Sequence, residues 1–395
     1  MKKRLFSVRL LLSIALILLV SPLVSTGSQS ISTYGTSAYD VSWLHTSGIY
    51  IYNEADQKID LRTINFNYGA GQGLTLSDIQ KVKALGFNTF RLIIYWRTIQ
   101  PYNETSAGID KLYFTTAKAP LRHGLDEVVN WAVQENLYII ISLCWTSTWG
   151  PPPWAFPGVS DDTQRYASLI NGTASRERAG IVNTWKYIAN RYKAVPNVLF
   201  ELLNEPFLWG KDKSLAGNDY KTFNEEIIAA IESVETRSHL KLVQLIMNND
   251  GWIEIIDTAV DISKSSNVVW TNHYYSPMNN WDPNGKYWHE SFTWHGQYFP
   301  QGWGNGTTFV AWRLIRVANR IHSWNKPWII TEFGKYVTQT YWKDWFNTVL
   351  RTQAEYNAAA WALWCYCSDP NFQAGWNINN PTTQQKIIGC LSAYA

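Results

Sequence analysis

Continuous apolar runs recur along the chain, separated by stretches whose apolar residues repeat with helical spacing. Runs that are apolar throughout, rather than alternating with polar residues, are typical of parallel strands covered on both faces. We predict strands at Thr63–Asn67, Thr89–Ile94, Tyr138–Leu143, Val198–Leu203, Leu242–Met247, Val268–Asn272, Trp328–Thr331 and Ala358–Leu363. We predict helices at Leu76–Leu85, Leu125–Gln134, Arg176–Tyr192, Tyr220–Val234, Trp252–Val260, Phe309–Trp324, Tyr341–Tyr356 and Thr383–Leu391.

This alternation defines the fold class. Eight strand–helix units over about 330 residues favour an α/β fold, one closed (β/α)8 TIM barrel, over an open doubly wound sheet. Gly48–Tyr52, a turn through Asn53–Gln57, and Lys58–Leu61 predict an N-terminal β-hairpin in front of the first barrel strand, where it could plug the barrel floor.

The first residues form a segment of a different kind. A basic start, an apolar stretch from Leu5 to Val20 and small residues before Ser28 predict a secretory signal peptide over residues 1–27. The alternative is an uncleaved membrane anchor, because the apolar stretch approaches the roughly 20 residues that span a bilayer. Residues 28–47 are rich in Ser, Thr and Tyr and are expected to be a linker or arm, and residues 48–395 the catalytic domain.

Charge then narrows the function. Removing residues 1–27 takes away four of the 34 basic groups and none of the 31 acidic groups, so the mature charge is close to neutral. Nothing in this balance favours nucleic acid, and we expect no stable membrane contact after signal cleavage. The chain contains 22 Trp and 22 Tyr. Most of these rings pack in the interior, but flat aromatic surfaces also suit the apolar faces of sugar rings.

The predicted loops are unequal in length. Long aromatic insertions follow strand three, at Trp145–Arg165, and strand six, at Tyr274–Gly306, whereas the helix-to-strand connection Lys193–Asn197 is short. The loops after the strands of such a barrel lie on the catalytic face, so the insertions predict a groove walled by aromatic side chains.

Cysteine and histidine positions argue against a metal site. Cys144, Cys365, Cys367 and Cys390 lack metal-ligand spacing, and a Cys367–Cys390 disulfide stays open. His289-Glu290 with His295 is not metalloprotease spacing, and Gly69–Gly73 lacks the dinucleotide pattern, so we expect neither a metal nor a cofactor. Three Asn-X-Thr sequons, at Asn103, Asn171 and Asn305, permit glycosylation.

Two predicted strands end abruptly in a glutamate. Asn204-Glu205-Pro206 closes the fourth strand, and Thr331-Glu332-Phe333-Gly334 closes the seventh, where the glycine permits a sharp exit. Strand ends meet at one mouth of a barrel, and two facing carboxyls are the minimal machinery for cleaving a glycosidic bond. The alternatives are that Asn204 caps a helix and that Glu332 forms a surface ion pair.

Five motifs, which follow one another along the chain at strand-length spacing, together resemble those of glycoside hydrolase family 5, the cellulase family. They are Asn204-Glu205-Pro206, Thr331–Gly334, Gly86–Arg91, His273-Tyr274-Tyr275 and Trp361–Trp364. The resemblance runs from about Gly48 to the C-terminus. It implies catalytic glutamates at the ends of barrel strands four and seven.

The resemblance also implies roles for single residues. Glu205 matches the acid/base and Glu332 the nucleophile, with their carboxyls about 5–5.5 Å apart and retention of configuration. Arg91, at the end of strand two, would lower the pKa of Glu332 and keep it ionised, and repulsion from that anion would keep the proton on Glu205. Asn204 matches the residue that binds the sugar 2-hydroxyl. The other three matched residues, which line the reacting subsite, are His273, Tyr275 and Trp364. Tyr275 would donate a hydrogen bond to Glu332, and Trp364 would form the floor of the subsite.

Taken singly, the supporting residues have simpler explanations. Arg91 could pair with any acid at a strand end, His273 could be a core histidine, and Trp364 could fill the barrel. One position departs from the family pattern, which often has histidine at the end of strand three, whereas this chain has Cys144 and Trp145 there. That departure puts one subsite contact in doubt but not the two glutamates.

We therefore expect a secreted, monomeric, retaining endo-β-1,4-glucanase that acts on a β-linked polysaccharide or oligosaccharide. A groove that holds several sugars favours internal cleavage. The nearest alternatives are the same chemistry on mannan, xyloglucan or another β-glycan. A non-catalytic carbohydrate-binding surface protein is disfavoured, because binding needs no paired acid and nucleophile.

Overall fold

The computed structural model describes most of the chain between residues 41 and 391. The described ranges are residues 41–66, 74–95, 123–144, 162–208, 210–248, 253–275, 292–294, 297–299, 305–339, 341–367, 369–371 and 375–391. The predicted signal peptide, most of the linker, most of both aromatic insertions, Gly69–Gly73, the Asn103 sequon, and His289, Glu290 and His295 lie outside these ranges. Within the described ranges, every helix is too short or too polar to pass through a lipid bilayer.

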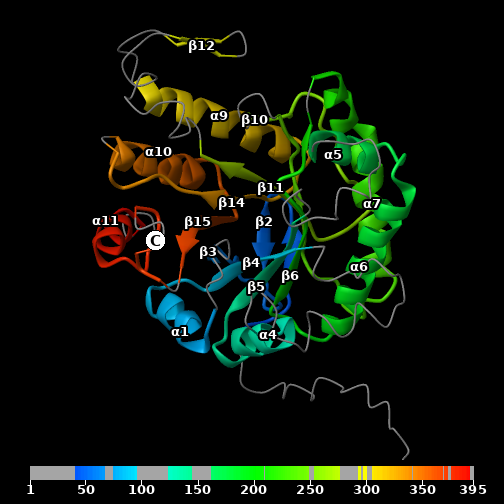
Figure 1. Ribbon diagram of the computed structural model, residues 1–395, viewed down its shortest axis with the longest axis horizontal. Coiled ribbons are helices and arrows are strands. Elements are labelled where there is room, and N and C mark those ends of the chain that lie inside the picture. Colours follow the sequence, from blue (N-terminus) through cyan, green and yellow to red (C-terminus); the bar gives the residue numbers. More distant parts are fainter. Residues whose placement is uncertain are drawn as a thin grey trace, which may run out of the picture. The chain divides into compact units, whose positions relative to one another are not determined.

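Eight parallel strands close into a barrel, in the order β3-β4-β5-β6-β8-β11-β14-β15 and back to β3 (Figure 1). Their bounds are β3 Leu61–Phe66, β4 Thr89–Tyr95, β5 Tyr138–Cys144, β6 Val198–Asn204, β8 Lys241–Gln244, β11 Val268–Tyr274, β14 Trp328–Phe333 and β15 Ala360–Tyr366. Each predicted strand overlaps one of these eight, and the TIM-barrel fold is confirmed. β5, β6 and β11 are buried along their whole length, as strands covered on both faces are.

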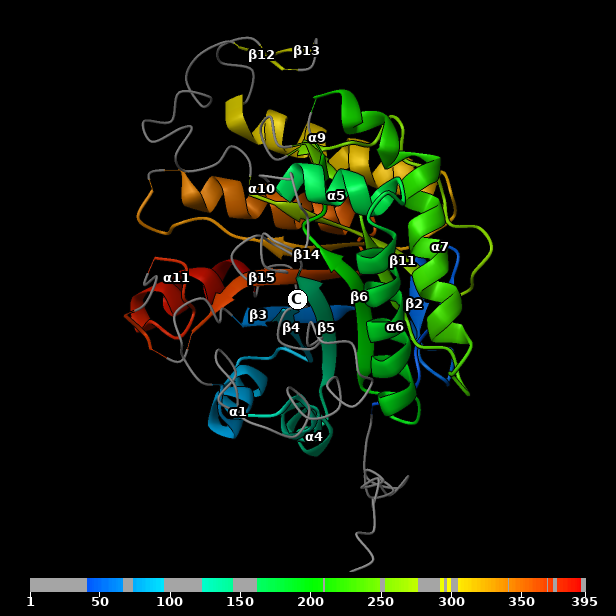
Figure 2. The ribbon, with the colours of Figure 1, turned by 45° about the vertical axis from the view of Figure 1, so that its right-hand side comes forward.

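Helices surround the barrel (Figures 1 and 2). Their bounds are α1 Leu76–Ala84, α4 Leu125–Gln134, α5 Asp162–Ile170, α6 Ser175–Tyr192, α7 Asn218–Glu232, α9 Asn305–His322, α10 Trp342–Glu355 and α11 Pro381–Leu391. Seven of the eight predicted helices are confirmed with small shifts at their ends. Two further helices were not predicted from the sequence: α5 and a 3-10 helix, η2, at Gly210–Ala216.

The predicted helix at Trp252–Val260 is wrong over its described residues, 253–260. There β10 (Ile253–Glu254) pairs with β9 (Met247–Asn248), which pairs in turn with β7 (Phe207–Leu208). The physical reason is a buried polar network. Glu254 accepts hydrogen bonds from Asn272 and Arg313, both at 2.8 Å, and these contacts hold the segment extended against the barrel. Tertiary contacts have overridden an apolar spacing compatible with a helix.

The N-terminal hairpin is confirmed, with a different pairing from the predicted one. β1 (His45–Ser47) pairs antiparallel with β2 (Tyr50–Tyr52), and Tyr52 also bridges to Lys58. Ile51 is fully buried in a cluster with residues from the starts of the barrel strands, including Leu61 and Leu199. The hairpin therefore packs against the floor of the barrel. A second, separate hairpin pairs β12 (Phe292–Trp294) with β13 (Gln297–Phe299).

All four cysteines are buried, and Cys367 and Cys390 are not joined in a disulfide. The two nearest sulfurs belong to Cys365 and Cys367, whose Sγ atoms lie 3.9 Å apart. The stability of the barrel therefore depends on packing and polar contacts rather than on covalent cross-links.

A buried ion-pair cluster lies at the start of β8. The Glu235 carboxylate accepts hydrogen bonds from Lys241 at 2.8 Å and from His239 at 2.6 Å, with Glu235 only 3% exposed. Burial raises the pKa of Glu235, but the hydrogen bonds and charges of His239 and Lys241 lower it by a larger amount, so the pKa is lowered overall. A carboxyl with a lowered folded-state pKa stabilises the fold above its ordinary pKa, and this stabilisation disappears as the pH falls through the folded value.

We expect Glu235→Gln to lower the free energy of unfolding at pH 7 by about 1–3 kcal/mol, the usual value for a hydrogen bond to a charged group. Urea unfolding of both proteins at pH 7 and at several values below pH 4 measures the difference. The gap should narrow at acid pH, because Glu235 itself becomes protonated there. A gap that is independent of pH would contradict this role for the carboxylate.

Candidate active site

Arg91 connects the polar residues at the mouth of the barrel. Its fully buried guanidinium donates from Nε to Glu201 and from Nη1 to Glu332, both at 2.5 Å. Nη2 donates to Asn204 at 2.6 Å and to Ser142 at 3.0 Å. A fork with five N–H donors suits such multiple recognition, which a lysine could not reproduce. Arg91 is the third residue of β4, not the end of the strand as expected.

The Glu332 carboxyl is almost completely enclosed, with 5% of its side chain exposed. One oxygen accepts from Arg91, and the other accepts from the Tyr275 hydroxyl at 2.7 Å. Burial raises its pKa, His273 and Arg91 lower it, and Glu205 raises it, so the pKa of Glu332 is raised overall. The expected lowering by Arg91 is present but is outweighed. Burial and the charge of Glu205 together exceed the lowering by His273 and Arg91.

Glu205 follows β6 in a left-handed backbone conformation, with a φ of 48°. Its backbone N–H donates to the side-chain oxygen of buried Gln244, at 2.8 Å. Non-glycine residues adopt this conformation at a cost, and such strain is concentrated at functional sites. The turn lifts the Glu205 side chain out of the strand, and 24% of it is exposed, in contrast to enclosed Glu332.

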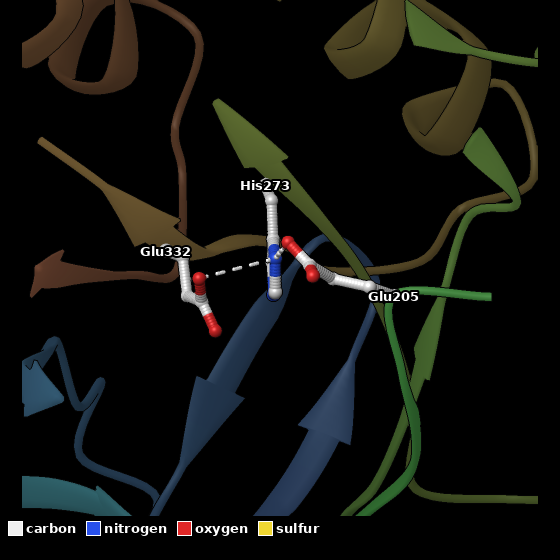
Figure 3. Close-up of side chains that lie close together, drawn as sticks. All are labelled: Glu205, His273 and Glu332. Atoms are coloured by element: carbon white, nitrogen blue, oxygen red, sulfur yellow. Dashed lines mark hydrogen bonds and ion pairs between the residues drawn. The ribbon is translucent and has the colours of Figure 1, made fainter. Parts of the chain in front are cut away.

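His273, near the end of β11, lies between the two glutamates (Figure 3). Its Nδ1 is 2.9 Å from a Glu205 oxygen and 3.4 Å from a Glu332 oxygen. The three side chains offer atoms that all lie within 4.8 Å of one another, a spacing that a metal ion could also use. Tyr275 and Arg91 already occupy the Glu332 oxygens, so the arrangement suits proton exchange between carboxyls better than metal ligation.

Asn204 and Cys144 form the wall beside Arg91. The Asn204 side-chain oxygen accepts from Arg91, and its nitrogen lies 3.7 Å from the Cys144 sulfur. The Asn204 carbonyl accepts from the hydroxyl of Tyr166, on α5, at 3.1 Å. Cys144, the last residue of β5, therefore takes the neighbourhood where the family often has histidine, while Trp145 lies outside the described residues.

An aromatic stack supports Tyr275. The Trp376 ring lies parallel to the Tyr275 ring, with centroids 5.5 Å apart, and Tyr336 packs on Trp376 at 4.6 Å. Burial raises the pKa of Tyr275 well above its ordinary value, and the charges of Glu332 and Glu205 raise it further. The hydroxyl therefore keeps its proton and acts as a donor to Glu332.

Trp364, in β15, is partly exposed and pairs in register with Asn65 of β3. Asn65 in turn accepts a hydrogen bond from Arg91 at 2.9 Å. The chain after Glu332 passes very close to Trp364, because a Cβ built on Gly334 would lie 2.7 Å from the Trp364 carbonyl oxygen. Gly334 is thus required by this close approach between β14 and β15, rather than by an unusual backbone angle.

The structure thus brings six of the seven predicted site residues into one hydrogen-bonded constellation, with Trp364 beside it. Several residues that contact this group were not predicted from the sequence, among them Glu201, Gln244 and Trp376. A signal existed for Glu201, because a charged residue inside an apolar strand needs a buried partner. Gln244 and Trp376 gave no comparable signal, since a glutamine at a strand end and a loop tryptophan are common.

A closed barrel whose mouth holds two carboxyls, an arginine and a histidine defines the class of glycoside hydrolases that work with paired acids. The chain belongs to glycoside hydrolase family 5, the cellulase family, whose family model matches residues 52–370.

Curated relatives are similar to parts of the chain. Endoglucanase B of Clostridium cellulovorans is 27% identical over 207 residues, which are 50% of this chain and 41% of that protein. Cellulase/esterase CelE of Acetivibrio thermocellus is 26% identical over 212 residues, which are 51% of this chain and 23% of that protein. The matches thus span less than half the length of these relatives.

Solved structures share the fold at low identity. Thermotoga maritima Cel5A in complex with cellobiose aligns with a TM-score of 0.57 and 19% identity, covering 84% of this chain and 97% of that one. Endo-glycoceramidase II from Rhodococcus sp., in complex with ganglioside GM3, aligns with a TM-score of 0.63 and 15% identity, covering 87% and 81%. At these identities the likeness establishes the fold alone.

Proposed function

We propose that the protein is a secreted, retaining endo-β-1,4-glucanase, with Glu332 as the nucleophile and Glu205 as the acid/base. The observation that carries the proposal is the proximity of the two carboxyls, which offer oxygens within 4.8 Å of each other. Retaining glycosidases have carboxyls about 5–5.5 Å apart, whereas inverting enzymes need roughly 6.5–9.5 Å to admit a water molecule. The short separation therefore supports a double displacement.

The first step forms a covalent intermediate. An oxygen of anionic Glu332 attacks the anomeric carbon, the bond from that carbon to the leaving oxygen breaks, and Glu205 donates its proton to that oxygen. The reaction then reverses these roles: Glu205 removes a proton from water, and the resulting hydroxide displaces Glu332 from the sugar. Greater exposure of Glu205 suits a group that must meet both leaving group and water.

The neighbouring side chains prepare these two groups. Arg91 and Tyr275 hold the Glu332 oxygens, so its attacking direction is defined before substrate binds. His273 contacts both carboxyls and offers a path for equilibrating their shared proton. For the sugar itself, we assign the 2-hydroxyl contact to Asn204 and the floor of the reacting subsite to Trp364.

Names of the relatives support β-glucan as the substrate. All five curated matches are endoglucanases or a cellulase, which favours cellulose-like glucan over mannan or xyloglucan. Assays on carboxymethylcellulose, glucomannan and xyloglucan separate these substrates. Secretion through a signal peptide at residues 1–27 belongs to the same proposal and is supported by the basic and apolar residues of that segment. A monomeric state is proposed with it.

Labelling with a mechanism-based 2-fluoro-glycoside tests the mechanism. The fluorine slows both the formation and the hydrolysis of the glycosyl-enzyme. Because a good leaving group restores the rate of formation alone, the glycosyl-enzyme accumulates. We expect mass spectrometry to find one sugar per chain, attached to Glu332. A label on Glu205, or hydrolysis with inversion and no label, would overturn the assignment.

A further inference from the structure

Glu201 is a carboxylate inside the barrel that the reaction described above does not use. It lies in the middle of β6, four residues before Glu205, and its side chain is completely buried. Ionised groups are very rarely buried unless they are paired, because they lose their hydration. Its close partner is the Nε of Arg91 at 2.5 Å, and the hydroxyl of Thr271 approaches its other oxygen at 3.5 Å.

Arg91 is therefore one cation between two carboxylates. Its Nε side faces Glu201 on β6, and its Nη1 side faces Glu332 on β14, at equal distances of 2.5 Å. Both carboxylates raise the pKa of Arg91 by more than burial lowers it, so the arginine stays charged throughout. Its charge can neutralise one of the two carboxylates but not both.

Charged and titratable groups face Glu332 from every neighbouring strand. They are Arg91 on β4, Glu201 and Glu205 on and after β6, His273 and Tyr275 on and after β11, and Cys365 on β15, which acts on Tyr275. With both Glu201 and Glu332 ionised, Arg91 leaves one negative charge uncompensated among the strands. Without Glu201, the Arg91–Glu332 pair would be neutral.

We propose that Glu201 is a positioning residue that takes a share of the Arg91 charge away from Glu332 and compensates that charge when Glu332 becomes esterified. This inference rests on the proposed role of Glu332 as the nucleophile. In the free enzyme, a less stabilised Glu332 anion is the more basic and more reactive carboxylate. In the glycosyl-enzyme, Glu332 carries no charge, and Glu201 is the anion that remains against Arg91.

Both effects act on the same step. If Glu201 were neutral, the Glu332 anion would be stabilised before attack, and the glycosyl-enzyme would contain a buried arginine without its counter-ion. Formation of the intermediate would become slower. Its breakdown, which restores anionic Glu332 beside Arg91, would not become slower. A purely structural role for Glu201 predicts no such difference between the two steps.

The variant Glu201→Gln tests this prediction, because glutamine keeps the shape and a hydrogen-bond acceptor but removes the charge. With a 2-fluoro-glycoside, we expect the second-order rate of trapping to fall about tenfold, which corresponds to one pKa unit of differential stabilisation. The rate of reactivation of the trapped enzyme should stay the same or rise. The acid limb of kcat/KM should move to lower pH by about one unit.

Glu254→Gln is the matched control. Glu254 is also buried and paired with a buried arginine, Arg313 at 2.8 Å, and it also accepts a hydrogen bond from Asn272, whereas Glu201 pairs with Arg91 of the site. We expect this variant to lose stability with an unchanged acid limb. If Glu201→Gln does not fold, Glu201→Asp is the test instead. Its shorter side chain moves the carboxylate away from Arg91, so the acid limb of kcat/KM should shift to lower pH by less than one unit.

An unshifted acid limb and an unchanged trapping rate in folded Glu201→Gln, or in Glu201→Asp where that variant is used, would overturn the inference. An equal shift in Glu254→Gln would overturn it too. These outcomes differ from failure of the proposed function, which would appear as absence of Glu332 labelling in the unmodified protein.

Discussion

Replacing Glu332 with Gln is expected to reduce hydrolysis of β-glucan by roughly 10⁴-fold or more, as loss of a nucleophile does in other covalent mechanisms. An amide cannot attack the anomeric carbon as a carboxylate can. The glutamine amide oxygen can still accept from Arg91, and its NH2 group can donate to the Tyr275 hydroxyl oxygen, at the two positions where Glu332 bonds these residues at 2.5 and 2.7 Å, so the site should keep its shape. Initial rates on carboxymethylcellulose and a binding isotherm for an oligosaccharide measure the two properties.

The binding isotherm separates catalysis from folding. We expect Glu332→Gln to bind the oligosaccharide with an affinity close to that of the parent protein. Glu226→Gln, which removes a half-exposed ion pair with Arg178, serves as the control and should keep full activity. Persistent hydrolysis by Glu332→Gln would contradict the assignment and would favour a role for Glu332 in structure alone.

Replacing Glu205 with Ala is expected to reduce hydrolysis of polysaccharide by roughly 10²–10⁴-fold, the usual contribution of a general acid or base. The loss should depend on the leaving group. Aryl glycosides with acidic phenols need no proton to depart, so formation of their glycosyl-enzyme should be much less affected. Rates measured across a series of phenols of different acidity show this dependence.

Azide provides the complementary measurement. The small anion needs no general base, and removal of the Glu205 side chain opens space at a position that is 24% exposed in the parent protein. With an aryl glycoside, we expect azide to accelerate Glu205→Ala and to yield a β-glycosyl azide, which retains the configuration of the substrate. An α-glycosyl azide, or no response together with an equal loss on all substrates, would argue against Glu205 as the acid/base.

Much of the fold could be predicted because the relevant information is local. Segments such as Tyr138–Cys144 are apolar at every position except Ser142, and a strand buried on both faces needs a nearly continuous apolar pattern. The helix predicted at Trp252–Val260 failed for a non-local reason. Asn272 and Arg313, distant in sequence, hold Glu254 in an extended segment. No periodicity within that segment records their presence.

In the candidate site, too, some features could be predicted from local sequence and others depend on contacts between distant residues. Strand-end glutamates at positions 205 and 332 stand out in the sequence, because apolar runs seldom end in a carboxyl without a reason. The net direction of the Glu332 pKa could not be predicted in the same way. It depends on burial and on the nearby charge of Glu205, which together outweigh His273 and Arg91, and these are properties of packed strands.

By itself, the sequence determined the number and order of the barrel strands, the family, and the positions of the two glutamates, because each follows from residue patterns a few positions long. Only the tertiary structure decided that Arg91 would stand between Glu201 and Glu332, that His273 would contact both glutamates, and that Gln244 would hold the Glu205 turn. Barrel closure brings side chains from five different strands within hydrogen-bond distance. Their mutual charge and burial then depend on distances between strands, which no stretch of sequence encodes.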